Sequence, residues 1–236
     1  MKHAEAPADT VMMGVMHDAL RRDFSRTRDI LAAPVVLGAR QASAIARHIS
    51  FMLVFLKEHH HNEDDKLWPL VLSHDPALGP LLDAMSKDHA AIAAEVDRLN
   101  DAAQQFGEQP SDTARDELVA AIDQLTVLLA PHLEREENEL MPRVSACLTA
   151  AHWRDFEKSA KPDLSVPVLA EYLNWFLEGL DPVRRRKVVA SMPAPIVLLS
   201  TRVFGPGYRR RAAERWAAAA RAQGTRRGPL GRRAAP

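Results

Sequence analysis

One eleven-residue pattern occurs twice in the 236-residue chain and constrains its fold more than any other feature. The pattern is H-x-x-x-E-[DE]-x-x-L-x-P, and it begins at His59 and again at His132. Each copy places a glutamate, Glu63 or Glu136, four residues after its histidine. On a helix, that spacing puts the imidazole and the carboxylate on one face, one turn apart. Such a pair can hold one metal ion, or its carboxylate can bridge two.

The two copies belong to a larger internal repeat. The segment from His17 to Phe24 matches the segment from His89 to Val96, at an offset of 72 residues. Each half is therefore predicted to be a helix hairpin, with one histidine on its first helix and one H-x-x-x-E on its second. Two such hairpins predict pseudo-twofold symmetry and a site between the halves.

Apolar residues at helical spacing predict helices over residues 10–33, 39–68, 80–106 and 112–148. Short turns with Pro and Gly separate them, and no segment shows a strand pattern. The Trp68-Pro69 dipeptide is predicted to end or kink the second helix, and Pro131 to bend the fourth. The expected fold is all-α: an up-down-up-down four-helix bundle followed by a helical C-terminal extension.

Six polar side chains fall on the apolar stripes of these helices. In an antiparallel hairpin, residues equidistant from the turn lie at the same height; His17 and His59, for example, have their midpoint at the turn residue Gly38. The six are therefore expected in one buried layer: His17, His59, Glu63, His89, His132 and Glu136. Buried carboxylates without partners are costly, and metal ions remove the penalty by binding their lone pairs. Mixed nitrogen and oxygen ligands suit iron best, with zinc or manganese as alternatives.

This set of residues resembles the hemerythrin-like family, the HHE cation-binding domain, over about residues 10–145. The resemblance implies a four-helix bundle that holds two iron ions in a non-haem centre with an oxo or hydroxo bridge. It also implies the roles of the ligands: Glu63 and Glu136 would bridge the irons, His17 and His59 would serve one iron, and His89 and His132 the other. Family members bind O2, NO or H2O2, and some sense or decompose these molecules.

The sequence also departs from the oxygen-carrying hemerythrins that it resembles. Those proteins have H-x-x-x-H on the third helix, where this chain has Ala93, and usually H-x-x-x-x-D in the last motif, where this chain has H-x-x-x-E. His60 is the candidate for an extra ligand. An open iron position favours redox chemistry over oxygen transport. We therefore expect peroxide decomposition (catalase-like) or NO handling in a stress response, with no catalytic residues beyond the metal centre. A non-catalytic O2 or NO binder or sensor, and an iron-holding or storage protein, are the alternatives.

Other polar residues near the motif have weaker patterns. Asp64 and Glu137 directly follow the two glutamates and are predicted either to accept hydrogen bonds from ligand imidazoles or to be surface charges. His61 points roughly 200° away from His59 on a helix, so it is not expected to be a ligand. His48 lies roughly 16 Å along the helix from His59, too far for the same centre, so a polar core or surface position is expected.

The chain is expected to divide into the bundle over residues 8–148, a helical extension over 149–223 and a basic, disordered tail over 224–236. Residues 202–236 contain ten Arg and one acid, Glu214, which makes their formal charge +9 and that of the remaining chain −9. A turn is predicted at Gly205-Pro206-Gly207, followed by a basic helix from Tyr208.

The charge separation suggests partners. The basic segment suits an anionic membrane face, an acidic partner, the acidic bundle of the same chain or that of a second copy in a homodimer. No nucleic-acid recognition motif accompanies it, so specific nucleic-acid binding is not expected. No apolar run approaches the roughly 20 residues that cross a bilayer. A single cysteine, Cys147, fits a reducing compartment. We therefore expect a cytoplasmic protein without a transmembrane segment.

Overall fold

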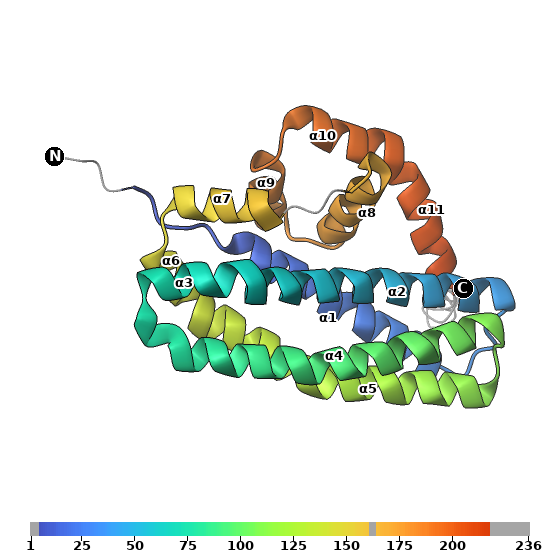
Figure 1. Ribbon diagram of the computed structural model, residues 1–236. Helices are drawn as coiled ribbons and strands as arrows, with labels where there is room; N and C mark the ends of the chain where they lie inside the picture. The colour runs from blue at the N-terminus through green and yellow to red at the C-terminus, as the bar shows by residue number, and fades with distance from the viewer. Residues whose placement is uncertain (1–4, 161–163, 218–236) are drawn as a thin grey trace, which may run out of the picture.

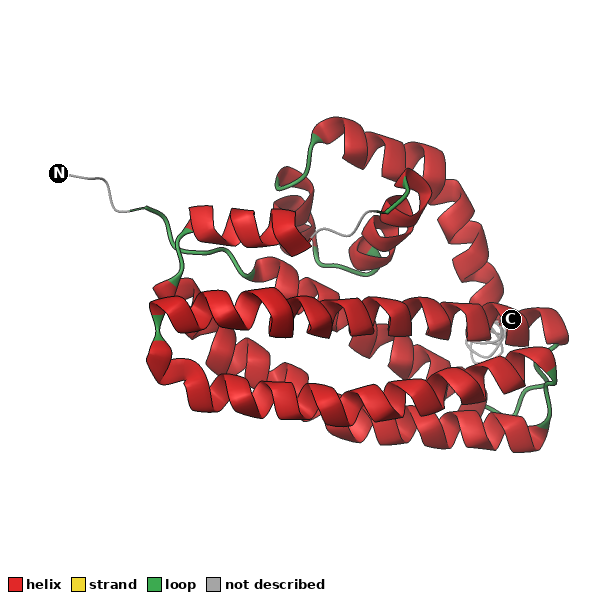
Figure 2. Cartoon of the chain, in the orientation of Figure 1, coloured by secondary structure: helices red, strands yellow, loops and turns green. Residues whose placement is uncertain are grey.

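The computed structural model describes residues 5–160 and 164–217. Four antiparallel helices joined by short turns form a bundle (Figure 1): α1 (Val11–Ala32), α2 (Ala39–Asn62), α4 (Gly79–Glu108) and α5 (Asp112–Arg135). Helices and loops account for the described residues, and no strand is drawn among them (Figure 2). The predicted all-α, up-down-up-down bundle with a helical extension is therefore confirmed.

The second and fourth bundle helices continue past the repeated glutamates through a short π-helical turn. After α2 come η1 (Glu63–Leu67) and α3 (Trp68–His74); after α5 come η3 (Glu136–Leu140) and α6 (Met141–Cys147). The prediction that Trp68-Pro69 ends or kinks the helix is wrong about the end, because the helix runs on to His74. Within the turn, the Trp68 N–H bonds the carbonyl of Glu63, five residues back. This wider turn lets Pro69 follow without breaking the helix.

The extension lies on one side of the bundle, over α1 and α2 (Figure 1). The extension contains α7 (Ala150–Ala160), α8 (Val166–Leu177), α9 (Pro182–Ala190), α10 (Ala194–Leu198), η4 (Leu199–Phe204) and α11 (Gly205–Arg215). One short element belongs to the bundle instead: the 3-10 turn η2 (Pro76–Leu78), which precedes α4. The turn predicted at Gly205-Pro206-Gly207 is wrong, because α10, η4 and α11 form one continuous helix. Pro206 follows the π-helical turn η4, in the same position that Pro69 takes after η1. The predicted tail over 224–236 lies outside the described residues.

The apolar core of the bundle forms two separate clusters. On α2 the first cluster extends to Leu56, and the second resumes at Leu67; on α4 the second cluster extends to Met85, and the first resumes at Ile92. On these two helices, the predicted polar residues fall between the two clusters. The first cluster also takes in α8 through Leu173, Trp175, Phe176 and Leu177, so the extension shares the core of the bundle.

Candidate metal centre

The structure brings the six predicted side chains together in one buried layer. They come from α1, α2 with η1, α4, and α5 with η3. The exposed fractions are 0% for His17, His132 and Glu136, 1% for Glu63, 4% for His89 and 8% for His59. His60, the predicted extra ligand, is 7% exposed. Solvent water therefore satisfies few of their polar atoms.

One group of donor atoms lies between α1 and α2. His17 Nε2 is 3.1 Å from His59 Nε2 and 3.4 Å from Glu136 Oε2. Glu63 Oε1 is 3.3 Å from the same His59 Nε2. Three of these residues, His17, His59 and Glu136, offer ligand atoms that all lie within 4.8 Å of one another. This is the spacing of donors that can share one metal ion.

A second group lies between α2, α4 and α5. His60, His89 and His132 also offer ligand atoms within 4.8 Å of one another. Glu63 Oε2 is 3.5 Å from His89 Nε2, and Glu136 Oε2 is 4.0 Å from His132 Nε2. Each glutamate therefore faces both groups. His60, which the sequence offered only as an extra candidate, completes the second group.

Unpartnered lone pairs test whether these residues fit a metal. Both carboxylate oxygens of Glu63 and of Glu136 are buried without a hydrogen bond, and so are the Nε2 atoms of His60, His89 and His132. Buried polar atoms are almost always paired in folded proteins, so this concentration of orphans calls for a ligand. These unpartnered atoms lie close together, and they are the nitrogen and oxygen donors that suit iron, manganese or zinc. The donor set fits a pair of metal ions.

Burial sets the charge states of the layer. Burial, together with the neighbouring Glu136 carboxyl, raises the pKa of Glu63 well above its usual range. Burial also raises the pKa of Glu136. Burial and the adjacent imidazoles lower the pKa of His59 and His60, and bring the pKa of His132 to about 4. The imidazoles of His59, His60 and His132 are therefore neutral ligands, and a bound cation would displace protons from the glutamates.

Carboxylates outside the layer orient two of the imidazoles. Glu137 Oε1 lies 2.8 Å from His17 Nδ1 and also accepts a hydrogen bond from Arg21. Burial opposes the charge on Glu137, but the hydrogen bonds from His17 and Arg21 outweigh it and lower the pKa of Glu137. An ionised carboxylate only accepts, so His17 Nδ1 carries the proton and its Nε2 lone pair points into the layer.

Asp64 does the same for His89. Its Oδ2 is 2.9 Å from His89 Nδ1, while the Ser86 hydroxyl donates to its Oδ1. A third carboxylate, which the sequence analysis missed, lies near an imidazole without a hydrogen bond to it: Asp88 Oδ2 is 3.5 Å from His132 Nδ1 and 3.1 Å from Arg135. The midpoint rule could have found it, because residues 88 and 132 are equidistant from the turn at Pro110.

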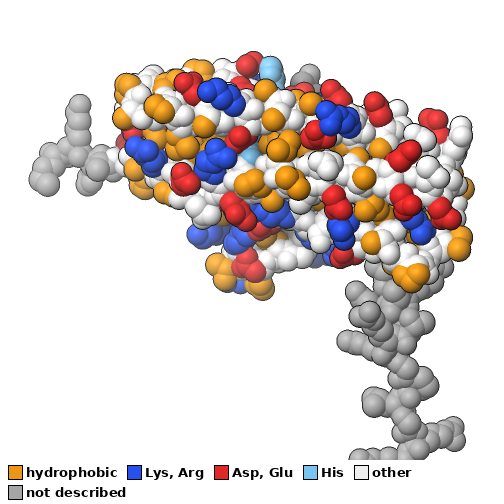
Figure 3. Space-filling model, turned by 90° about the horizontal axis from the view of Figure 1, so that it is seen from below, with side chains coloured by type: hydrophobic (Ala, Val, Ile, Leu, Met, Phe, Trp, Pro, Cys, Tyr) orange, Lys and Arg blue, Asp and Glu red, His pale blue; other side chains and the backbone are white. Residues whose placement is uncertain are grey.

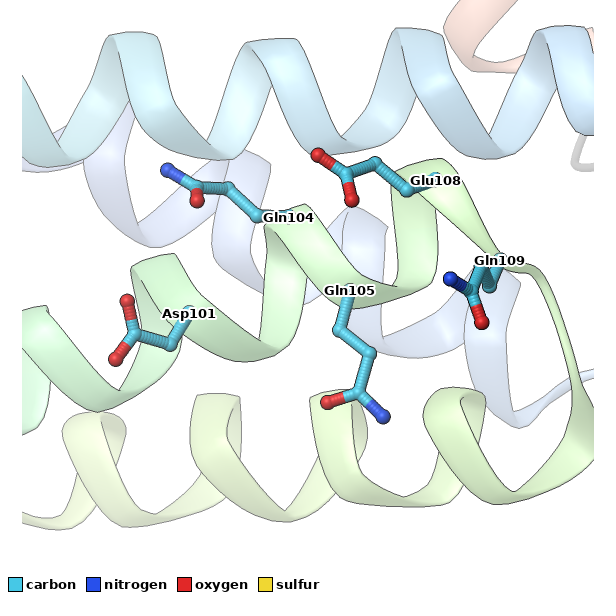
Figure 4. A pocket seen from close by; sticks show the side chains of 5 residues that line it. All are labelled: Asp101, Gln104, Gln105, Glu108 and Gln109. Atoms are coloured by element: carbon cyan, nitrogen blue, oxygen red, sulfur yellow. The ribbon is translucent and has the colours of Figure 1, made fainter.

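Several other polar residues lie outside the layer. His61 is exposed and pairs with Asp65, so it points away from the layer. His48 is a polar core residue that contacts Asp23. A polar hollow near the end of α4 contains none of the candidate ligands (Figure 4); it is lined by Asp101, Gln104, Gln105, Glu108 and Gln109.

Comparison with known protein families matches residues 10–144 to the hemerythrin HHE cation-binding domain. The match covers more than half of the chain, so the chain belongs to this family. Together with the buried His and Glu groups, membership indicates a metal-binding protein, with iron as the typical metal. No curated protein and no solved structure matches the chain. Within residues 5–160 and 164–217, none of the helices has the length and apolar character to span a bilayer.

Proposed function

We propose that the chain holds two iron ions in this layer and reacts there with a small oxidant, with the decomposition of hydrogen peroxide as its main activity. His17 and His59 would hold one ion, and His60, His89 and His132 the other. Glu63 and Glu136 would reach both. The observation that carries the proposal is the sharing of two unpartnered glutamates between two separate donor groups.

The number of donors supports reaction rather than storage. The first group offers two imidazoles besides the shared glutamates. This donor set is similar to the sites of two histidines and one carboxylate in which iron keeps open coordination positions. Bound iron would supply the redox change, in which one peroxide is reduced to water and a second is oxidised to dioxygen. The chain itself holds the donors and excludes large molecules by burial. It also directs the Nδ1–H groups of His17 and His89 toward the carboxylates of Glu137 and Asp64, which accept these hydrogen bonds.

A contact path from the layer to the extension favours a second function, the sensing of O2 or NO. Phe55 stacks on His59, with ring centroids 5.7 Å apart. The same ring lies 5.4 Å from Trp175 and 5.3 Å from Phe176 on α8. A ligand that moved His59 would therefore press on the extension. In this function, the centre binds the gas without turning it over.

Metal content and an absorption spectrum of the chain purified in air are the first test. We expect about two irons per chain and oxo-bridge bands in the near-ultraviolet. Glu63→Ala should lose the iron and the evolution of gas from added peroxide, whereas His61→Ala, a neighbouring exposed histidine, should keep both. A chain that holds zinc or no metal would overturn the proposal. Intact peroxide together with an NO-dependent spectral shift would support the sensor, and iron without either reaction would indicate iron holding.

A further inference from the structure

The outward face of the extension exposes aliphatic side chains on a well-packed helix. In the continuous helix of α10, η4 and α11, the inward residues are buried against the protein: Ser200, Gly205, Tyr208, Ala212 and Arg215. On the outward side, Leu198 is 60% exposed, Leu199 40% and Val203 62%. Leu199 and Val203 are one helical turn apart, so they form one apolar strip.

The chain segment that contains this strip is rich in basic residues and has no acidic ones. From Pro182 to Ala213 the chain has eight basic residues and no Asp or Glu. Two of the eight pair with acids elsewhere, Arg184 with Asp18 and Arg211 with Glu171. Exposed side chains without an ion pair to any described residue remain: Arg185, Arg186, Lys187, Arg202, Arg209 and Arg210. By contrast, the face in Figure 3 mixes acidic and basic side chains.

The aliphatic and basic residues share the outward face. Arg202 lies about one turn after Leu198 and next to Val203, and the exposed Arg209 and Arg210 follow about two turns later on the same continuous helix. The preceding helix α9 also exposes an aliphatic and a basic side chain, Val183, which is 56% exposed, and Arg186. An apolar strip with a basic border is the side-chain pattern of a helix that lies in a membrane interface.

We propose that this face, defined by Leu198, Leu199, Arg202, Val203, Arg209 and Arg210, binds the surface of an anionic lipid bilayer. The aliphatic side chains enter the boundary between headgroups and acyl chains, and the guanidinium groups bind lipid phosphates. Both halves of the pattern are then used. A nucleic acid would neutralise the arginines but give the aliphatic strip no apolar contact, and no exposed aromatic ring is available on this face for stacking on bases.

Sedimentation of the full chain with lipid vesicles tests the proposal. We expect binding to vesicles of phosphatidylcholine with about one third phosphatidylglycerol, and little binding to phosphatidylcholine alone. The double variant Leu198→Ser/Val203→Ser should weaken binding to the anionic vesicles roughly tenfold or more, because it removes the inserted area and keeps every charge. The control Val127→Ser, on α5 and 68% exposed, should bind as the wild type does.

Three results would overturn the proposal. The first is a wild-type chain that binds neither kind of vesicle, or both equally. The second is unchanged binding of the double variant, which would assign the attraction to charge alone. The third is a wild-type dimer in solution that the double variant converts to a monomer, which would make the face an interface between two copies. Circular dichroism of each variant shows whether the helices are retained.

Discussion

The bundle contains two buried clusters of histidine and carboxylate, and they differ in how their polar atoms are satisfied. In the metal layer, no oxygen of Glu63 or Glu136 has a hydrogen bond. In the other cluster, called the Asp23 cluster here, a fully buried carboxylate has three partners: His48 Nε2 at 2.7 Å, Arg22 Nε at 2.8 Å and Trp175 Nε1 at 2.9 Å. The same residue types therefore occur once with carboxylate oxygens that lack a hydrogen-bond partner and once with a carboxylate that has all its partners.

The pKa values follow this difference. Burial raises the pKa of Glu63, and nothing in the layer opposes it. Burial also works against the charge on Asp23, but the hydrogen bonds from His48 and Arg22 outweigh it and hold its pKa well below the usual range. A buried His and carboxylate pair therefore does not by itself mark a metal site. Unsatisfied lone pairs do, whereas the Asp23 cluster joins α1 and α2 to α8 and attaches the extension.

The largest expected effect is the loss of stability in Asp23→Ala. The substitution leaves a buried arginine–histidine–tryptophan set without its acceptor, and breaking a buried ion pair in this way costs about 3–5 kcal/mol. Iron content per folded chain should be unchanged. Urea unfolding of the iron-loaded chain measures the loss. Asp123→Ala, which breaks the exposed pair with Arg28, is the control and should cost less than about 1 kcal/mol. Loss of iron in Asp23→Ala would show that the two clusters are not independent.

Acid should remove the advantage of Asp23 over Asn at the same position. Its pKa in the folded chain lies below the ordinary value of 3.8. The stability contributed by its charge is therefore fully present above pH about 3.8 and is lost as the pH falls toward the lower, folded-state pKa. Urea midpoints of the wild type and Asp23→Asn should converge between pH about 4 and 2. A gap of constant size across that range would mean that Asp23 is not ionised in the fold.

The two clusters also differ in what the sequence reveals. The metal layer was predictable, because a repeat, a helical period and the turn midpoints together fix both the face and the height of each side chain. Asp64 and Glu137 were predictable as candidates for the same reason, since they follow the glutamate in both copies of the repeat. The metal-binding role of each residue stays a prediction.

The Asp23 cluster could not be predicted in this way. Glu95, which occupies the equivalent position of the repeat, pairs with the exposed Arg98 instead. Trp175 is 152 residues away in sequence, so no local spacing links it to Asp23. His48 was expected to be polar core or surface, and only its partner decides between them. The π-helical turns are not expected from the sequence, because a proline such as Pro69 normally marks the end or a kink of a helix. One signal does point to them: the spacing from Glu63 to Pro69 is the same as the spacing from Glu136 to Pro142 in the second copy of the repeat.

Within the metal layer, the orienting carboxylates are expected to have a smaller effect than the Asp23 cluster. Asp64→Asn keeps the size of the side chain but weakens its hold on the Nδ1 proton of His89. Changes of this kind typically lower metal affinity 10–100-fold. Competition with an iron chelator measures the affinity. Asp65→Asn is the matched control, because Asp65 is the next residue and its side chain is 57% exposed. Equal affinities for the two variants would show that Asp64 does not orient a ligand.

The smallest expected effect has the opposite sign. In the metal-free chain, Glu63→Gln should raise the free energy of unfolding by about 1 kcal/mol at neutral pH, because a neutral amide is less costly to bury than a carboxylate. The sign follows from its raised pKa: the folded chain holds the proton more tightly, so stability falls as the pH rises above the ordinary value of 4.5. The gain should therefore vanish near pH 4.5. Glu137→Gln, at a carboxylate whose pKa is lowered, should lose stability instead. If Glu63→Gln were also less stable without metal, the glutamate would have a partner in the empty fold, and its lone pairs would no longer distinguish the metal layer from the Asp23 cluster.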